Sequence, residues 1–304
     1  MSGGVRTGEK GIIDPQVVLL DIAFFVFFLL YTFIIIVFRE SVVAWAIALR
    51  DLVIAAVVVG VSSIVIRHRG ENTRAILRGL LVVAACGLLF KVAEQTQHAF
   101  IGGWLDEQII SLDHALWGME TSGALQQFVH PLLTEWMMFA YVVYIPLIPF
   151  TLFVVSGSGG EKGIHDYLLN LSLSYLLCYV GFMLYPLATQ MHHDPGMYTV
   201  PLEGWFFTWC GEWMRMNVHA PGAALPSPHC AAATVILVMF HRYHRRLFYV
   251  VLPVILTLYA ATVYCRYHYL WDSIAGILTA VVVLTASPKL VQSIAARSRR
   301  PIVR

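Results

Sequence analysis

The sequence predicts an all-α protein, a polytopic membrane helix bundle of about eight spans. Hydrophobic residues make up 59% of the 304 positions and charged residues only 12%, whereas a soluble domain carries about 25% charged residues. The apolar residues gather in runs close to the roughly 20 residues that cross a bilayer. The net charge of +2 is too small to indicate nucleic-acid binding. We therefore expect the membrane, and no nucleic acid, as a partner.

Eight apolar runs are predicted to span the membrane, and the sixth is the shortest. They cover Val17–Phe38, Val43–Ile66, Ala75–Gln95, Leu132–Val155, Tyr167–Ala188, Ser227–Phe240, Leu247–Tyr264 and Tyr269–Ser287. We expect a polar tail at 1–16, an N-terminal pair of spans at 17–74, a six-span core at 75–290 and a basic tail at 291–304.

Two connecting stretches are predicted to lie at the membrane surface. The first, Gly102 to His130, places apolar residues at helical spacing, which is typical of an interfacial helix: Ile109, Leu112, Leu116 and Met119. The second, Thr189 to Leu225, is expected to be a long loop. Its aromatic residues suit a belt at the level of the lipid headgroups: Trp205, Phe206, Phe207, Trp209 and Trp213.

Loop charges predict the orientation, because cytoplasmic loops carry an excess of Lys and Arg. In an eight-span protein one side holds Arg6, Lys10, Arg67, Arg69, Arg74, Lys162, Arg242, Arg245, Arg246, Arg297, Arg299 and Arg300. The other side holds Asp106, Glu107, Asp113, Glu120, Asp194, Glu203 and Glu212. We expect both termini in the cytoplasm and the second side to be external, periplasmic or lumenal.

Ser227-Pro228-His229 predicts the start of a helix, because Ser is a good N-cap and Pro a good first helical residue. His229 would lie in the first turn, beside the positive end of the helix dipole, where an anion is stabilised. His268 and Asp272 are four residues apart and would share a helical face, with the carboxylate holding the imidazole in one tautomer. One hairpin separates the two histidines, so both return to the predicted external side. Together they form a workable phosphoryl-transfer site.

The five cysteines contain no C-x-x-C pair, so neither a zinc site nor a disulfide framework is indicated. Cys86 and Cys178 lie in apolar runs and are expected in the core. Cys210, Cys230 and Cys265 fall near one membrane face, and their spacing does not decide whether two of them pair.

These motifs resemble the type-2 phosphatidic acid phosphatase superfamily, whose pattern is P-S-G-H followed by R-x5-H-x3-D. The chain has Pro226-Ser227-Pro228-His229 and His268-Tyr269-Leu270-Trp271-Asp272. The H-Y-x-x-D form is similar to the branch that contains inositol phosphorylceramide synthase. Further likenesses to that branch lie at Asp113-His114-Ala115-Leu116-Trp117-Gly118, Glu135, Tyr141, Tyr144 and Tyr185-Pro186-Leu187-Ala188.

The resemblance implies a lipid phosphatase or an inositolphosphotransferase-like enzyme that acts on a phospholipid or another lipid phosphate. His268 would be the nucleophile that forms a phosphohistidine, Asp272 would orient it and His229 would protonate the leaving oxygen. Water would accept the phosphoryl group in a phosphatase. A lipid hydroxyl, such as that of a ceramide or diacylglycerol, would accept it in a transferase. No metal and no cofactor is expected.

The chain departs from the family pattern at the phosphate-binding positions. Thr262 stands where the third motif has Arg, the K-x6-R-P element is absent, and Pro228 replaces the Gly of P-S-G-H. The residues predicted to bind phosphate instead are Ser227, Arg266, Lys91 and Arg215. Lys91 is also three residues from Glu94, and the two could simply form an ion pair.

Two alternatives stay open at this point. Twelve histidines and the in-span Arg50-Asp51 motivate a transporter or a haem-binding membrane protein. The missing Arg and Lys motivate a catalytically inactive family member with a binding role.

Overall fold

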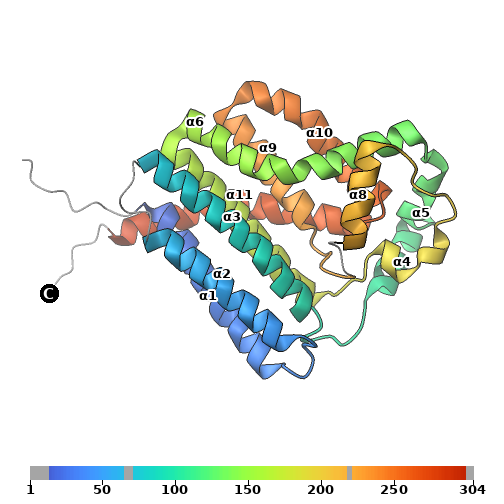
Figure 1. Ribbon diagram of the computed structural model, residues 1–304, viewed down its shortest axis with the longest axis horizontal. Coiled ribbons are helices and arrows are strands. Elements are labelled where there is room, and N and C mark those ends of the chain that lie inside the picture. Colours follow the sequence, from blue (N-terminus) through green and yellow to red (C-terminus); the bar gives the residue numbers. More distant parts are fainter. Residues whose placement is uncertain (1–13, 65–70, 218–220, 299–304) are drawn as a thin grey trace, which may run out of the picture.

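The chain folds as an all-α bundle (Figure 1). The computed structural model describes residues 14–64, 71–217 and 221–298, and these contain no strand. The long helices are α1 (Pro15–Val37), α2 (Trp45–Ile64), α3 (Glu71–Thr96), α6 (Pro131–Leu184), α9 (Pro228–Tyr243), α10 (Arg245–Tyr264) and α11 (Leu270–Ser298). The shorter ones are α4 (Asp106–Trp117), α5 (Thr121–Leu125), the 3₁₀ helix η2 (Gln126–Phe128), α7 (Gln190–His193), the 3₁₀ helix η3 (Pro195–Met197) and α8 (Phe206–Asn217).

The predicted polytopic bundle is confirmed. Within the described residues, six helices are long and apolar enough to cross a membrane: α1, α2, α3, α6, α10 and α11. Many of their large apolar side chains point outward; Phe25 and Phe33 of α1, for example, are about 60% exposed. An outward apolar surface on helices of this length is typical of a bundle that lies in lipid.

Helix α6 contains both the fourth and the fifth predicted spans. It is 54 residues long and turns back at Gly160, whose φ of 58° and ψ of −149° are accessible essentially to glycine alone. Across this turn the Tyr167 hydroxyl donates to the Ile148 carbonyl at 2.8 Å, so the two arms lie side by side. The expected loop between Val155 and Tyr167 is therefore wrong, because the helix continues to the glycine.

Helix α9, the shortest predicted span, lies at the centre of the bundle. It has 16 residues, about 24 Å at 1.5 Å per residue, and it contacts α6, α10 and α11. Ala231, Ala232 and Ala233 are fully buried. Small side chains let neighbouring membrane helices approach closely, which is why a short helix can organise the core.

The N-terminal helices pack directly against the predicted core. Tyr31 of α1 is fully buried, and its hydroxyl donates to the Tyr179 carbonyl of α6 at 2.8 Å. Asp21 of α1 pairs with Arg78 of α3. Helix α2 packs against α3 and α1. The first two spans therefore belong to the same bundle, and the boundary at residue 74 stays a prediction.

The two surface stretches are more helical than expected. The 102–130 stretch folds into α4, α5 and η2, and Leu112, Leu116 and Met119 are exposed there as an interfacial helix requires. The predicted loop 189–225 is wrong over its middle, because it contains α7, η3 and α8. Helices α4, α5 and α8 gather at one end of the molecule (Figure 1).

The opposite end collects the predicted cytoplasmic connections. Arg242 of α9 pairs with Asp166 of α6 at 3.0 Å, and Asp14 before α1 pairs with His165 at 2.8 Å. Several predictions lie outside the described residues. They concern the tail over 1–13, the last two residues of the second span, and the basic residues Arg6, Lys10, Arg67, Arg69, Arg299 and Arg300.

Candidate active site

The first histidine is placed as the sequence predicts. Helix α9 begins at Pro228, and the Ser227 side chain caps it by accepting a hydrogen bond from the Cys230 N–H. His229 therefore lies in the first turn. Ser227 is fully buried, so its hydroxyl serves the helix.

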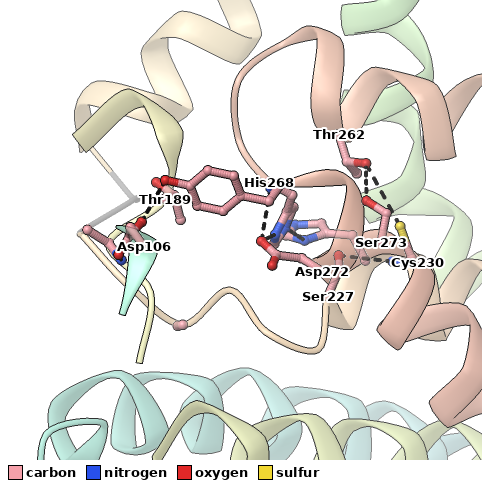
Figure 2. Close-up of polar contacts among 12 residues, drawn as sticks. Asp106, Thr189, Ser227, Cys230, Thr262, His268, Asp272 and Ser273 are labelled. Carbon is pink, nitrogen blue, oxygen red and sulfur yellow. Dashed lines mark hydrogen bonds and ion pairs between the residues drawn. The ribbon is translucent and has the colours of Figure 1, made fainter. Parts of the chain in front are cut away.

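The second histidine lies outside the helix on which it was expected. Helix α11 begins at Leu270, so His268 precedes it. The predicted pairing is nevertheless present: Asp272, in the first turn, accepts from His268 Nδ1 at 3.3 Å and from the Tyr269 N–H at 3.0 Å (Figure 2). Asp272 is fully buried and His268 is 3% exposed. The carboxylate thus orients the imidazole and caps the helix at once.

The two histidines meet. His268 Nε2 lies 3.2 Å from His229 Nδ1, and the other ring nitrogen of His229 lies 3.2 Å from the Tyr141 hydroxyl. The Tyr141 ring stacks on both His229 and Tyr267. Tyr267 in turn donates to the Gly211 carbonyl of α8 at 3.0 Å. Elements far apart in the sequence therefore fix the orientation of both imidazoles.

A tight junction between α9 and α11 holds the histidines in register. The Ser227 N–H donates to the Asp272 carbonyl at 2.9 Å. Gly276 of α11 faces this junction, and a Cβ there would lie only 2.3 Å from the Ser227 carbonyl oxygen. Thr262, which stands where the resembled motif has Arg, is fully buried behind the junction and pairs with Ser273 at 2.8 Å (Figure 2). Its role is in helix packing.

Two buried aspartates of α4 support the site and were not predicted to do so. Asp106 accepts from the Tyr269 hydroxyl and the Ala188 N–H, both at 2.8 Å. Asp113 accepts from the Trp271 indole N–H at 2.7 Å. Both are fully buried. The two aspartates thus hold Tyr269 and Trp271, on either side of Leu270, by hydrogen bonds. The only signal for this support in the sequence is the likeness at Asp113.

A cavity of about 20 Å³ lies at the histidines, enough for roughly one water molecule. Its lining includes Glu94, Tyr141, Thr189, His192, His229, Tyr267 and His268. Thr189 has a φ of 79°, unusual for a β-branched residue, and the chain around it is held by Asp106. Burial, reinforced by the charge of Arg215, lowers the pKa of His192 from its ordinary value.

The three basic residues predicted to bind phosphate do not line the histidine cavity. Lys91 pairs with Glu94 at 2.8 Å, as the spacing allowed, and Arg215 pairs with Glu212 at 2.6 Å. The Arg266 guanidinium stacks on the Tyr198 ring, since its φ of 68° turns the chain there. Arg215 and Arg266 line a separate cavity of about 340 Å³ that shares Met191 with the histidine cavity.

Glu135 stabilises the start of a helix. Its carboxylate accepts from the backbone N–H groups of Trp205, Phe207 and Thr208 and so caps the start of α8. All five cysteines are free thiols. Among the described residues, no group of three or more His, Cys, Asp or Glu is arranged to hold a metal ion.

The family model described as the PAP2 superfamily matches residues 107–286, which include α4 and both histidines. No curated protein and no solved structure matches the chain.

Proposed function

The chain belongs to the PAP2 superfamily, and from this premise we propose that it is an integral-membrane lipid phosphatase or phospho-headgroup transferase that works through a phosphohistidine. The observation that carries the proposal is the row Asp272–His268–His229, with neighbouring distances of 3.3 Å and 3.2 Å and with Asp272 and His268 buried. A carboxylate, a nucleophilic imidazole and a second imidazole in line are the groups that a two-step phosphoryl transfer requires.

In the first step His268 Nε2 attacks phosphorus, and the bond from phosphorus to the lipid oxygen breaks. His229, protonated, gives its proton to that oxygen, so the leaving group departs as a neutral alcohol. Asp272 stabilises the positive charge that develops on His268, as a buried carboxylate does for a catalytic histidine. For the phosphoryl group to enter, the two imidazoles must separate from their 3.2 Å contact.

In the second step an oxygen nucleophile attacks the phosphohistidine, and neutral His229 takes its proton. The nucleophile is water in a phosphatase and a lipid hydroxyl in a transferase. The likeness to the inositol phosphorylceramide synthase branch favours the transferase.

The phosphate's negative charge would be met by protein groups, and we propose a metal-independent reaction. Protonated His229 lies at the N-terminal end of α9, where the helix dipole favours an anion. Arg215 and Arg266, in the adjoining cavity, would draw a lipid phosphate toward the site, while Ser227 and Lys91 remain weaker candidates. The loop charges support an external or lumenal site with both termini in the cytoplasm.

A product assay tests the function. The purified protein would receive phospholipid labelled in its phosphate, with or without ceramide or diacylglycerol, in the presence of EDTA. A labelled product lipid identifies a transferase, and labelled free phosphate identifies a phosphatase. We expect His268→Ala and His229→Ala each to remove nearly all turnover. Full turnover in either variant would overturn the assignment.

A further inference from the structure

A second cavity, of about 440 Å³, lies beside the histidines. One turn of chain, α7, separates the two cavities. Thr189 and His192 line the histidine cavity, whereas Gln190 and His193 line the larger one. Tyr269, directly after His268, also lines the larger cavity. A lipid bound in the larger cavity would therefore be separated from the histidines only by α7.

Gln190 is the unusual residue of this cavity. Its side chain is 1% exposed, yet neither its amide nitrogen nor its amide oxygen has a hydrogen-bond partner among the described residues. Buried polar groups in folded proteins are almost always paired, so an unpaired one indicates a missing partner. An amide offers two N–H donors and a carbonyl acceptor, and a hydroxyl group, which both donates and accepts, complements it.

The remaining polar lining of the cavity combines three carboxyl groups with His114, His193 and Tyr269. Glu107, Glu120 and Asp194 supply the carboxyl groups, and Glu107 pairs with His193 at 3.1 Å. Glu120 is buried, and one of its oxygens accepts from the Ser122 hydroxyl at 2.9 Å. Burial raises the pKa of this carboxyl, and the hydrogen bond from Ser122 partly opposes the rise. Carboxyl groups accept hydrogen bonds from hydroxyls and repel phosphate, so the phosphate itself belongs in the histidine cavity.

The mouth of the cavity faces an apolar surface. Met119 lines the cavity and is 52% exposed, and Leu116 and Trp117, just before it, are 55% and 56% exposed. Acyl chains would lie against this surface while a polar group entered the cavity.

We propose that this cavity binds the hydroxyl groups of the alcohol part of the lipid substrate, with Gln190 and Glu120 as the main contacts. The inference rests on the proposed function, which places a lipid alcohol beside His268. Two sources share this chemistry: the polyhydroxylated head group of a donor lipid and the alcohol end of an acceptor lipid. An ammonium head group fits less well, because it carries no acceptor for the Gln190 amide nitrogen.

Binding without turnover tests the site. The full-length protein in phosphatidylcholine nanodiscs would be titrated calorimetrically with four probes that share an octyl chain: octyl glucoside, 1-octylglycerol, octyl phosphate and octylammonium. We expect Gln190→Leu to weaken the binding of at least one hydroxylated probe about tenfold, the effect of two lost hydrogen bonds. A loss confined to octyl glucoside identifies the donor head group, and one confined to 1-octylglycerol identifies the acceptor.

Gln127→Leu is the matched control, because Gln127 lies on the neighbouring 3₁₀ helix, is exposed and does not line the cavity. It should leave all four affinities unchanged. Gln190→Leu should also raise the Tm of the ligand-free protein, since it replaces an unpaired buried amide, and this confirms that the variant folds. Unchanged affinities of Gln190→Leu for both hydroxylated probes would overturn the inference. Stronger binding of octylammonium than of either hydroxylated probe to the wild-type protein would also overturn it.

The experiments distinguish a failure of the proposed binding site from a failure of the proposed function. His268→Ala should retain octyl glucoside or 1-octylglycerol binding even though it abolishes turnover. If His268→Ala retains turnover, the proposed function fails while the binding site stands. If Gln190→Leu binds the probes normally while His268→Ala is inactive, the binding site fails while the function stands.

Discussion

At the scale of single residues, the site depends on one buried carboxylate. Asp272 accepts from both His268 Nδ1 and the Tyr269 N–H. In Asp272→Asn the amide oxygen can still accept one of these hydrogen bonds, but the negative charge that stabilises the charged imidazole is lost. We expect about a 100-fold fall in kcat, with the helix content by circular dichroism unchanged.

The control for this prediction is Asp166→Asn at the opposite end of the bundle. Asp166 also bonds several neighbours, Arg242 and Tyr243 among them, but it lies far from the histidines. The Asp166→Asn variant should lower the stability of the protein and leave kcat within about twofold of the wild-type value. Equal losses of kcat in the two variants would show that Asp272 acts only by holding the fold.

His192 gives the site a pH-dependent stability. Burial, together with Arg215, lowers its pKa from the ordinary 6.5, so the folded protein holds fewer protons on this residue than the unfolded chain does. The resulting stability is complete above about pH 6.5 and is lost as the pH falls through the lowered pKa. We expect Tm to fall less steeply from pH 7 to pH 5 in His192→Gln than in the wild type. Parallel Tm curves would contradict this.

At the scale of elements, the contact between α9 and α11 sets the distance between the histidines. A methyl group at Gly276 would meet the Ser227 carbonyl oxygen at 2.3 Å and the Cys230 Cβ at 3.1 Å. Gly276→Ala must therefore push the two helices apart, and we expect at least a tenfold loss of kcat together with a lower Tm. Turnover and thermal unfolding of the purified variant measure both effects.

Gly87→Ala in α3 is the matched substitution. No atom lies within 4 Å of the position where its Cβ would be built, and alanine is favoured over glycine inside a helix by roughly 0.5–1 kcal/mol. It should leave kcat unchanged and hold or raise Tm. A similar loss of activity in both variants would mean that helix contact at Gly276 is not what positions the histidines.

The sequence predicted the parts of the site that depend on local chemistry. The start of α9 follows from Ser227 and Pro228 alone, and the Asp272–His268 contact follows from their short separation, although α11 begins after His268. The support from Asp106 joins residues 163 positions apart, and that from Asp113 spans 158. Such pairings depend on how whole elements pack, and no local pattern encodes them.

Charge alone does not locate a phosphate ligand, because the placement of a long basic side chain depends on tertiary structure. Arg266 is one of the residues predicted to bind phosphate, but the backbone turns at this residue and its guanidinium stacks on Tyr198. The α8 helix was missed because its N-terminal cap comes from Glu135, which lies in another helix. The membrane spans are predicted more reliably than the phosphate ligands. A run of about 20 apolar residues indicates a membrane helix without any knowledge of the tertiary structure.

At the scale of the whole molecule, the bundle has two distinct ends. The histidines lie with α4 and α8, and the basic residues Arg242, Arg245 and Arg246 lie with the turn of α6. The loop charges predict that the histidine end is external. We therefore expect Glu203→Cys to react with a membrane-impermeant maleimide in intact cells, and Arg246→Cys to react only after permeabilisation.

This labelling is best made in a Cys210→Ser background. The other four cysteines are buried, whereas Cys210 is partly exposed. Labelling of Arg246→Cys in intact cells, with Glu203→Cys protected, would reverse the orientation and place the site in the cytoplasm.

The central claim is that the phosphoryl group passes through His268, and the direct measurement is to trap it there. The protein would be mixed with a phosphate-labelled lipid, quenched in alkali, which preserves phosphohistidine, and mapped by mass spectrometry. The account predicts phosphate on His268 in the wild type and none in His268→Ala. Phosphate on another residue, or turnover by His268→Ala without a phosphoenzyme, would contradict it.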